Sequence, residues 1–545
     1  MTNHRHLFID DFHLSRIEGL KRTMHPAEKH PANPVIKSDR PWEHEGGPWA
    51  RPGAYYDARE RLCKMWYNSN AFGGHTGYAT STDGVHWEKP MLGLVEFERS
   101  KNNNIVESEG RVWQIVHDDH PPASLPAGCR HLGISWTAEK GQFIQTSADG
   151  LRWTTGRAIQ FYGGDAITAV KAQACLTGPN PADLPASPTL PDQPRYVASN
   201  RWCVPVGRFD GSSKLRPTRR ALMLYQSNDF LTWEKPLRIL TPDERDDQMA
   251  HARIEAALAD GSLATDCKED RRCEFYDMTI VPYEDLYVGL MLVFDPSFQF
   301  TRVGGMNQSG PMEIQLVASR DLVDWQRLGD RQPFIPRGGP GQHDWAMAVF
   351  VSLPIVKDGK LWFYYTGACV IHGGNVEANL RDQRAADHYQ MLRTKIASGE
   401  LPGMNSIGLA TVRRDGFVSL DAGHEAGYVL TKPFALPAAG VLHLNTDARG
   451  GEVRVALCQP DGTPYLGYEQ SHPLTGDLLD AVVTWPKHGA TEARSLDNLY
   501  THETAAEAGT AQNNDYEKSR RLGPGKPVRL KITARNAKLY SYWFA

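Results

Sequence analysis

The chain has 545 residues and a formal net charge of −4, and 10% of its residues are aromatic. This length exceeds that of one ordinary domain and allows a large core. The near-neutral charge gives no sign of a nucleic-acid partner or of a membrane surface, and no apolar run approaches the length of a membrane span.

The eight cysteines are scattered along the chain and show none of the CxxC or CxxH spacing typical of a zinc site. The first residues enter a strand-like run without the long apolar core of a signal peptide. We therefore expect a cytoplasmic protein with reduced thiols, no bound transition metal and no cofactor, although the sequence leaves room for a structural calcium ion.

The first predicted strand, Leu7 to Leu14, carries the acid pair Asp10 and Asp11. After a segment rich in Pro and His, a short sequence motif recurs: an apolar strand, a turn built on Ser and Asp, and an aromatic residue that opens another strand. Four copies end in Trp, and the fifth is degraded. The copies are 79–87, 145–153, 225–233, 317–325 and 410–417.

Each residue type in the recurring motif has a physical role. Asp can bond its own backbone in a tight turn, Gly tolerates positive φ, and the aromatic ring packs against a neighbouring sheet. The copies lie about 65 to 95 residues apart, which indicates one supersecondary unit per copy, stacked on its neighbours. We read these units as the five blades of a β-propeller.

The apolar runs between the turns assign the strands. The predicted inner strands are 50–56, 111–116, 166–174, 275–281 and 346–354. The predicted second strands are 62–67, 131–136, 196–200, 286–294 and 361–366. In the first blade, 77–80 forms the third strand and Trp87 opens the fourth. An insertion, 375–398, has helical spacing and could be a lid, an oligomer contact or a covering helix.

After Asp421 the pattern changes to short alternating runs separated by turns such as 459–462, which is typical of a β-sandwich. The sequence therefore predicts an all-β protein. Residues 1–425 would form a five-bladed β-propeller with the catalytic site, and residues 426–545 a C-terminal β-sandwich. The sandwich would support the propeller or bind sugar.

Acidic residues stand where the predicted inner strands begin. The inner strands of a propeller surround a central funnel, so side chains at their starts converge from distant parts of the chain. Glycoside cleavage needs one protonated carboxyl group and one ionised carboxylate, and crowding pushes their pKa values apart. The candidate catalytic residues are Glu43, Glu45, Asp165, Glu274, Asp277 and Asp344. Each could instead be an ordinary turn or cap residue.

A second set of residues near these strand ends could hold a sugar ring or its hydroxyl groups. The candidate substrate-binding residues are Asp10, Asp11, Trp49, Arg51, His117, His343 and Trp345. Packing is the alternative for the tryptophans and Arg51, a structural role for the histidines, and a turn cap for the aspartates.

The turns and the acid-rich inner strands resemble the five-bladed propeller glycosidases of glycoside hydrolase families 32, 43 and 68. Uncharacterised bacterial members of that superfamily carry similar motifs. The matching segments here are 7–11, 64–67, 78–87, 274–276 and 407–417. The chain lacks the Trp-Met-Asn-Asp-Pro-Asn-Gly start of family 32 and has no clear Arg-Asp-Pro match.

The resemblance implies a carbohydrate substrate, often a furanoside such as a fructoside or an arabinoside. It implies an acid in the first blade as base or nucleophile, a middle acid that stabilises the transition state, and a later Glu as proton donor. The corresponding residues are Glu43 or Glu45 (or Asp10 and Asp11), Asp165 and Glu274.

The leading hypothesis is a glycoside hydrolase with Glu274 as general acid and Asp165 as the residue that orients the sugar. Asp344, Asp277 or a first-blade carboxylate would act as base or nucleophile. Three alternatives remain open. A sialidase has a longer Asp-box, six blades and an arginine triad; a non-catalytic carbohydrate-binding propeller would use the acids as calcium or hydroxyl ligands; a phosphorylase would depend on phosphate.

Overall fold

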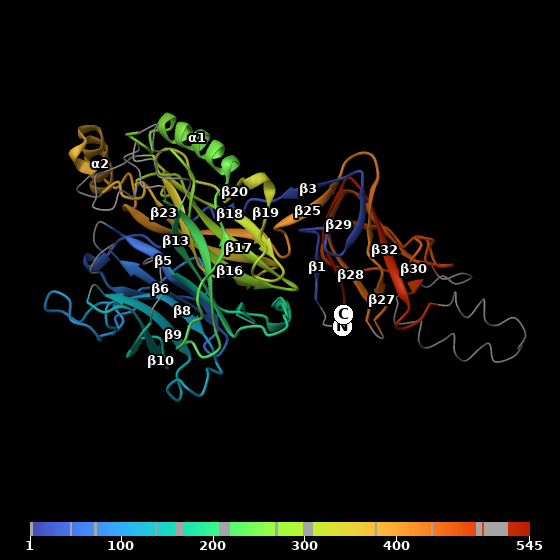
Figure 1. The fold of residues 1–545 in the computed structure, drawn as a ribbon, viewed down its shortest axis with the longest axis horizontal. Helices are drawn as coiled ribbons and strands as arrows, with labels where there is room; N and C mark the ends of the chain where they lie inside the picture. The colour runs from blue at the N-terminus through green and yellow to red at the C-terminus, as the bar shows by residue number, and fades with distance from the viewer. Residues whose placement is uncertain are drawn as a thin grey trace, which may run out of the picture. The chain divides into compact units, whose positions relative to one another are not determined.

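A computed structural model describes most of the chain. The described residues are 4–43, 46–69, 74–137, 139–159, 161, 167–173, 175–205, 218–266, 271–297, 309–375, 379–437, 440–486, 493–494 and 522–545. Two candidate catalytic residues, Glu45 and Asp165, lie outside this part. The predicted fold class is confirmed: the protein is all-β, a propeller with a β-sandwich (Figure 1).

The chain divides into two compact units, Pro26–Val412 and the combination of Met1–His25 with Arg413–Ala545. This division differs from the predicted one at residue 425, because strands at the start of the chain pair with strands near its end. β1 (His6–Leu7) pairs with β33 (Ala537–Phe544), β2 (Leu14–Glu18) pairs with β26 (Gly427–Thr431), and β3 (Leu20–Met24) pairs with β25 (Val418–Ala422).

The Pro26–Val412 unit holds three separate antiparallel sheets and one ten-stranded sheet. Their strands form five antiparallel groups in chain order, and a parallel bridge between Met312 and Met347 joins the fourth and fifth groups into the ten-stranded sheet. The five groups are β5 (Pro48–Asp57), β6 (Leu62–Ser69) and β7 (Thr76–Ser81); β8 (Arg111–His117), β9 (His131–Thr137), β10 (Gly141–Ser147) and β11 (Thr154–Ala158); β12 (Ile167–Lys171), β13 (Tyr196–Pro205), β14 (Thr218–Ser227) and β15 (Leu237–Leu240); β16 (Glu274–Tyr283), β17 (Leu286–Phe294), β18 (Met312–Ser319), β19 (Gln326–Arg327) and β20 (Pro333–Ile335); and β21 (Met347–Val351), β22 (Ile355–Lys357), β23 (Lys360–Ala368), β24 (Asn405–Arg413) and β4 (Glu28–Lys29).

The first strand of each group lies next to the first strand of another, as in a propeller, and we refer to the five groups as blades. Hydrogen bonds tie these strands together. Gln114 on β8 donates to the carbonyl of Ala169 on β12 at 3.1 Å, and Thr279 on β16 donates to the carbonyl of Val351 on β21 at 2.9 Å. β4 pairs with β24, so a segment from the start of the chain supplies the outer strand of the fifth blade.

The recurrent turn has the same hydrogen bonds in four copies. In the first copy, Ser81 Oγ accepts from the amide of Gly84 at 2.8 Å, Asp83 Oδ1 accepts from the amides of Val85 and His86 at 2.8 Å each, and Trp87 Nε1 donates to the Gly84 carbonyl at 3.2 Å. The copies at 147–153, 227–233 and 319–325 repeat these bonds. Each of these four turns directly follows the third strand of its group, β7, β10, β14 or β18.

Two helices extend from the blades. α1 (Glu244–Ala259) begins at a capping box formed by Asp243 and Asp246, and α2 (Gln383–Ala397) begins at the cap residue Asp382. α2 confirms the helix predicted within 375–398, whereas α1 lies in a charged segment for which no helix was predicted. Among the described residues, no helix has the length and apolar character needed to cross a membrane.

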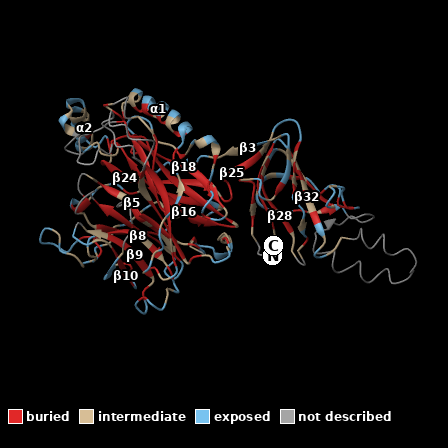
Figure 2. Ribbon diagram, in the orientation of Figure 1, coloured by how far each residue is buried: buried red, intermediate tan, exposed pale blue. Residues whose placement is uncertain are grey.

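The second unit is built from strands of both chain ends. Besides β1–β3 these are β25 (Val418–Ala422), β26 (Gly427–Thr431), β27 (Phe434–Ala435), β28 (Leu442–Cys458), β29 (Leu474–Val482), β30 (Trp485–Pro486), β31 (Ala493–Arg494), β32 (Pro527–Arg535) and β33 (Ala537–Phe544). Their apolar side chains form one core that includes Leu457, Leu530 and Trp485. Buried residues run along the strands of each unit (Figure 2).

Candidate functional site

Arg51 joins three blades of the propeller. Its backbone is on β5, and its guanidinium donates to the carbonyl of Ile167 at 3.2 Å and to Thr168 Oγ1 at 2.8 Å, both on β12. The same guanidinium is ion-paired with Asp277 Oδ2 on β16. Only 4% of Arg51 and 2% of Asp277 are exposed, so this ion pair is buried where three inner strands meet. The structure thus brings together two candidate site residues that are far apart in sequence.

The two oxygens of Asp277 have different surroundings. Oδ2 accepts from Thr168 Oγ1 at 2.9 Å and pairs with Arg51, which favours the ionised carboxylate. Oδ1 is buried and has no hydrogen-bond partner among the described residues. A register shift of β16 against β17, between Phe275 and Asp277, sets the direction of these side chains. Buried acceptors are nearly always paired, so Oδ1 is an atom that a ligand or water would satisfy.

Glu274 starts β16 and lies between two arginines. It is ion-paired with Arg220 on β14, and Arg272 donates to its Oε1 through Nε at 2.8 Å and Nη2 at 2.7 Å. Burial by itself raises the pKa of Glu274, but the two guanidiniums more than offset burial, so the pKa is lower than usual. This environment favours the carboxylate and weighs against the predicted role of Glu274 as proton donor.

Aromatic rings surround these charged groups. Trp49, which is half-buried, stacks on Phe350 with ring centroids 5.3 Å apart, and the Arg51 guanidinium lies 4.5 Å from the Phe350 ring. Tyr276 lies edge-on to Phe350 with ring centroids 6.5 Å apart, and the Arg201 guanidinium lies over the Tyr276 ring, 3.9 Å from its centroid. Aromatic faces beside charged and polar groups are typical of small-molecule sites.

We call this set of contacting residues the axial cluster. Its members are Trp49, Arg51, Thr168, Arg201, Arg220, Arg272, Glu274, Tyr276, Asp277, Phe350 and His372, whose Nε2 lies 3.1 Å from the Tyr276 hydroxyl. Sequence reasoning proposed four of them, Trp49, Arg51, Glu274 and Asp277, as site residues.

Glu43 is fully buried in the first blade rather than in the axial cluster. Its Oε1 accepts from the Tyr67 hydroxyl at 2.7 Å and pairs with Lys89 at 2.6 Å. Its Oε2 accepts from the backbone amides of Asp39 and Arg40 at 2.9 and 3.1 Å. Both oxygens are occupied, which favours a structural role for Glu43 over the predicted catalytic one.

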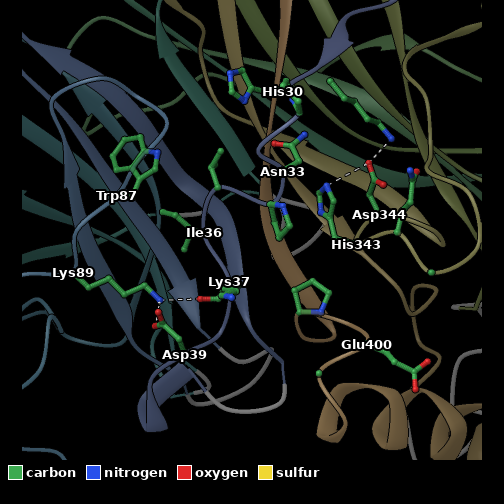
Figure 3. A pocket seen from close by; sticks show the side chains of 18 residues that line it. His30, Asn33, Ile36, Lys37, Asp39, Trp87, Lys89, His343, Asp344 and Glu400 are labelled. Carbon is green, nitrogen blue, oxygen red and sulfur yellow. Dashed lines mark hydrogen bonds and ion pairs between the residues drawn. The ribbon is translucent and has the colours of Figure 1, made fainter.

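Asp344 and His343 line a cleft of about 670 Å³ (Figure 3). Asp344 Oδ2 pairs with Lys29 at 2.5 Å and accepts from the Tyr365 hydroxyl at 2.7 Å, whereas Oδ1 is buried with no partner among the described residues. His343 Nδ1 lies 3.0 Å from Ser406 Oγ. The described contacts of Asp344 are with the fifth blade and with β4, not with the axial cluster. Its predicted catalytic role and the predicted sugar contact of His343 stay predictions.

The remaining candidates lie elsewhere. His117 stacks on Tyr55 at 4.8 Å, at the end of β8 opposite to the strand start. Trp345 packs in the hydrophobic cluster of α2, which favours the packing role over a sugar contact. Asp10 caps a turn by accepting from the amide of Phe12 at 3.0 Å, and Asp11 pairs with Arg22. Both aspartates belong to the unit that contains the sandwich.

Comparisons with known proteins find only remote likeness. Searches with the sequence find no matching family model and no matching curated protein. Among solved structures, a glycosyl hydrolase from Bacteroides ovatus has a TM-score of 0.35 and 12% identity, over 75% of this chain and 97% of that one. The β-1,2-mannobiose phosphorylase from Listeria innocua has a TM-score of 0.35 and 11% identity, over 72% and 97%. The family 43 endo-arabinanase from Bacillus licheniformis has a TM-score of 0.28 and 10% identity, over 57% and 88%. Likeness at this level gives no information on activity, so the function is argued from the site.

Proposed function

We propose that this protein is a glycoside hydrolase whose reaction takes place at the axial cluster. The observation that carries the proposal is Asp277. One of its oxygens is fixed by groups from two other blades, and the other is a buried acceptor without a partner among the described residues. A carboxylate oriented in this way suits a general base or a nucleophile in glycoside cleavage.

The residues around Asp277 have distinct roles in this proposal. Arg51 and Thr168 hold the carboxylate in one orientation and keep it ionised. The half-buried ring of Trp49, backed by Phe350, offers an apolar face to a sugar ring. Glu274 orients Arg220 and Arg272 rather than donating a proton. A furanoside such as a fructoside or an arabinoside is the substrate class that the family resemblance implies.

The test uses amide substitutions and two kinds of leaving group. We expect D277N to lose activity about 10²- to 10⁴-fold on natural glycosides and on aryl glycosides with good leaving groups alike, because both need the carboxylate. E274Q, D165N and E45Q are measured in parallel. The proton donor is the residue whose amide variant fails on natural glycosides yet retains activity on activated ones.

Three results would reject the proposal or its assignments. Full activity of D277N on natural glycosides would remove its catalytic role. Selective rescue of E274Q by a good leaving group would show that Glu274 is the proton donor, as the sequence predicted. Tight oligosaccharide binding by the wild type without turnover of any glycoside would indicate a binding propeller instead of an enzyme.

A sugar phosphorylase is the second candidate, because three of the four arginines of the axial cluster, Arg201, Arg220 and Arg272, gather beside Glu274 and Tyr276. Guanidinium groups bind phosphate oxygens through paired hydrogen bonds. A phosphorylase would release a sugar phosphate, and its turnover would depend on added inorganic phosphate. A hydrolase would give free sugar at the same rate with and without phosphate.

A further inference from the structure

The cleft that contains Asp344 has the size of a small-molecule site. Its volume is about 670 Å³, within the range of pockets that take small ligands. Four parts of the Pro26–Val412 unit line it: the segment 29–39, the first-blade residues Trp87 and Lys89, the loop 341–344, and residues 399–402 after α2 (Figure 3). The cleft is therefore built by segments that are distant in sequence.

Most charged side chains in the wall of the cleft are held in ion pairs, and the lining residues Lys37 and Glu400 add one charge of each sign. Lys29 pairs with Asp344 at 2.5 Å. Lys89 pairs with Asp39 and with Glu43 at 2.6 Å each, and it also donates to the carbonyl of Lys37 at 2.9 Å. A charged ligand would have to compete with these ion pairs. A neutral ligand with hydroxyl groups can add hydrogen bonds without breaking them.

Asp344 is only 1% exposed, and its carboxylate provides a buried hydrogen-bond acceptor in the wall of the cleft. Lys29 and the Tyr365 hydroxyl hold Oδ2 in place, whereas Oδ1 has no partner among the described residues. An acceptor that is buried and unpaired costs free energy, and a donor that reaches it recovers that cost. Oδ1 lies against Gly338, where a Cβ atom would be 2.2 Å from it, so a ligand hydroxyl becomes such a donor only with a shift of this backbone.

Trp87 adds an apolar surface on the other side of the cleft. The residue is half-buried, and its indole N–H donates a hydrogen bond to the Gly84 carbonyl at 3.2 Å. Its ring packs edge-on against Tyr364 with ring centroids 5.4 Å apart. What remains of the ring is apolar. A sugar combines an apolar ring face with hydroxyl groups, so it matches a wall that pairs an indole with fixed polar groups.

From these observations we infer that the cleft is a second ligand site, which binds an uncharged sugar unit independently of the axial cluster. The inference does not need the axial cluster to be catalytic. It requires only that neutral sugar binds next to Trp87 and Asp344.

The test is binding of glucose, mannose, xylose, arabinose and sucrose to the full chain, measured by saturation-transfer difference NMR. Glucuronate and glucosamine serve as charged counterparts. We expect at least one neutral sugar to bind, and W87A to weaken it about threefold to tenfold. The matched control is W233A, because Trp233 has the same turn position in the third blade but does not line the cleft. D277N should leave this binding unchanged.

D344N is the second variant, and it keeps the shape of the side chain while removing its charge. Weaker neutral-sugar binding in both D344N and W87A, with W233A unchanged, supports the inference. Absence of binding by any neutral sugar overturns it, as does wild-type affinity in both cleft variants or equal loss in W87A and W233A. Tighter binding of glucuronate or glucosamine than of the neutral sugars overturns the choice of an uncharged ligand. Loss of binding in D277N would assign the sugar to the axial cluster instead.

Discussion

At the scale of single residues, Glu43 shows how a carboxylate near the start of a strand can stabilise the fold instead of taking part in catalysis. It accepts hydrogen bonds from Tyr67, Lys89 and two backbone amides while fully buried. We expect E43A to lower the free energy of unfolding by about 3–5 kcal/mol, because Lys89 would keep a buried charge with one partner fewer. Urea unfolding followed by tryptophan fluorescence measures this change.

Glu60 supplies the control for Glu43, since it also pairs with a lysine but its side chain is 59% exposed. E60A should cost less than about 1 kcal/mol. If E43A proves as stable as E60A yet loses glycosidase activity, Glu43 is a catalytic residue after all. The sequence could not separate these roles, because a Glu before an inner strand looks the same whether its partners are a ligand or the protein.

The same limit explains which members of the axial cluster the sequence missed. Arg201 and Arg220 come from the second and third strands of the third blade, and Phe350 comes from near the end of β21. No local motif marks them, and a shift of one residue in register would turn their side chains to the opposite face. Trp49 and Asp277 could be predicted because they lie at or near the start of inner strands.

At the scale of elements, the recurrent turn places a glycine against a tryptophan of the previous blade. Gly150 has a φ of +77°, and a Cβ atom there would lie 2.4 Å from Cζ2 of Trp66. Gly128 has a similar φ of +80°, but a Cβ atom there would meet nothing within 4 Å. We expect G128A to cost about 1–2 kcal/mol from backbone strain, and G150A about 1–3 kcal/mol more from overpacking. Thermal unfolding of both variants measures the difference, and equal losses would show that Trp66 moves aside freely.

Regular strands were the most predictable elements, because each combines an apolar run with a recognisable turn. The five inner strands lie at β5, β8, β12, β16 and β21, close to the expected ranges. In contrast, the fourth strand expected at Trp87 is reduced to a single bridge between Thr80 and Glu88. α1 was missed because its buried face has only small or isolated apolar residues such as Ala250, Ile254 and Ala257 in a charged segment.

At the scale of the whole molecule, the start of the chain contributes to both compact units. β1–β3 pair with strands of the sandwich unit, and β4 supplies the outer strand of the fifth blade. Segments this far apart in sequence carry no shared local pattern, so the boundary near residue 425 was predicted only from the alternating runs that begin after Asp421. Pairing between chain ends is a long-range property that only the folded structure displays.

We expect the Pro26–Val412 unit to lose stability in mild acid, because it contains two buried histidines, His131 and His343, and the half-buried His117. Burial, aided by the charges of His117 and Arg130, lowers the pKa of His131 from 6.5 to about 3, and burial also lowers the pKa values of His117 and His343. Below about pH 6.5 these histidines bind protons in the unfolded chain but stay neutral in the folded unit. The free energy of unfolding therefore falls as pH decreases. His131 alone should cost about 2 kcal/mol between about pH 6.5 and about pH 5.

H131F keeps an aromatic ring among Trp66, Tyr55 and Trp153 but cannot titrate, so it should flatten this dependence in calorimetric unfolding of the full chain. The exposed His251 on α1 provides the control, since H251F should leave the slope as it is in the wild type. An unchanged slope in H131F would show that other groups set the acid limit of the propeller.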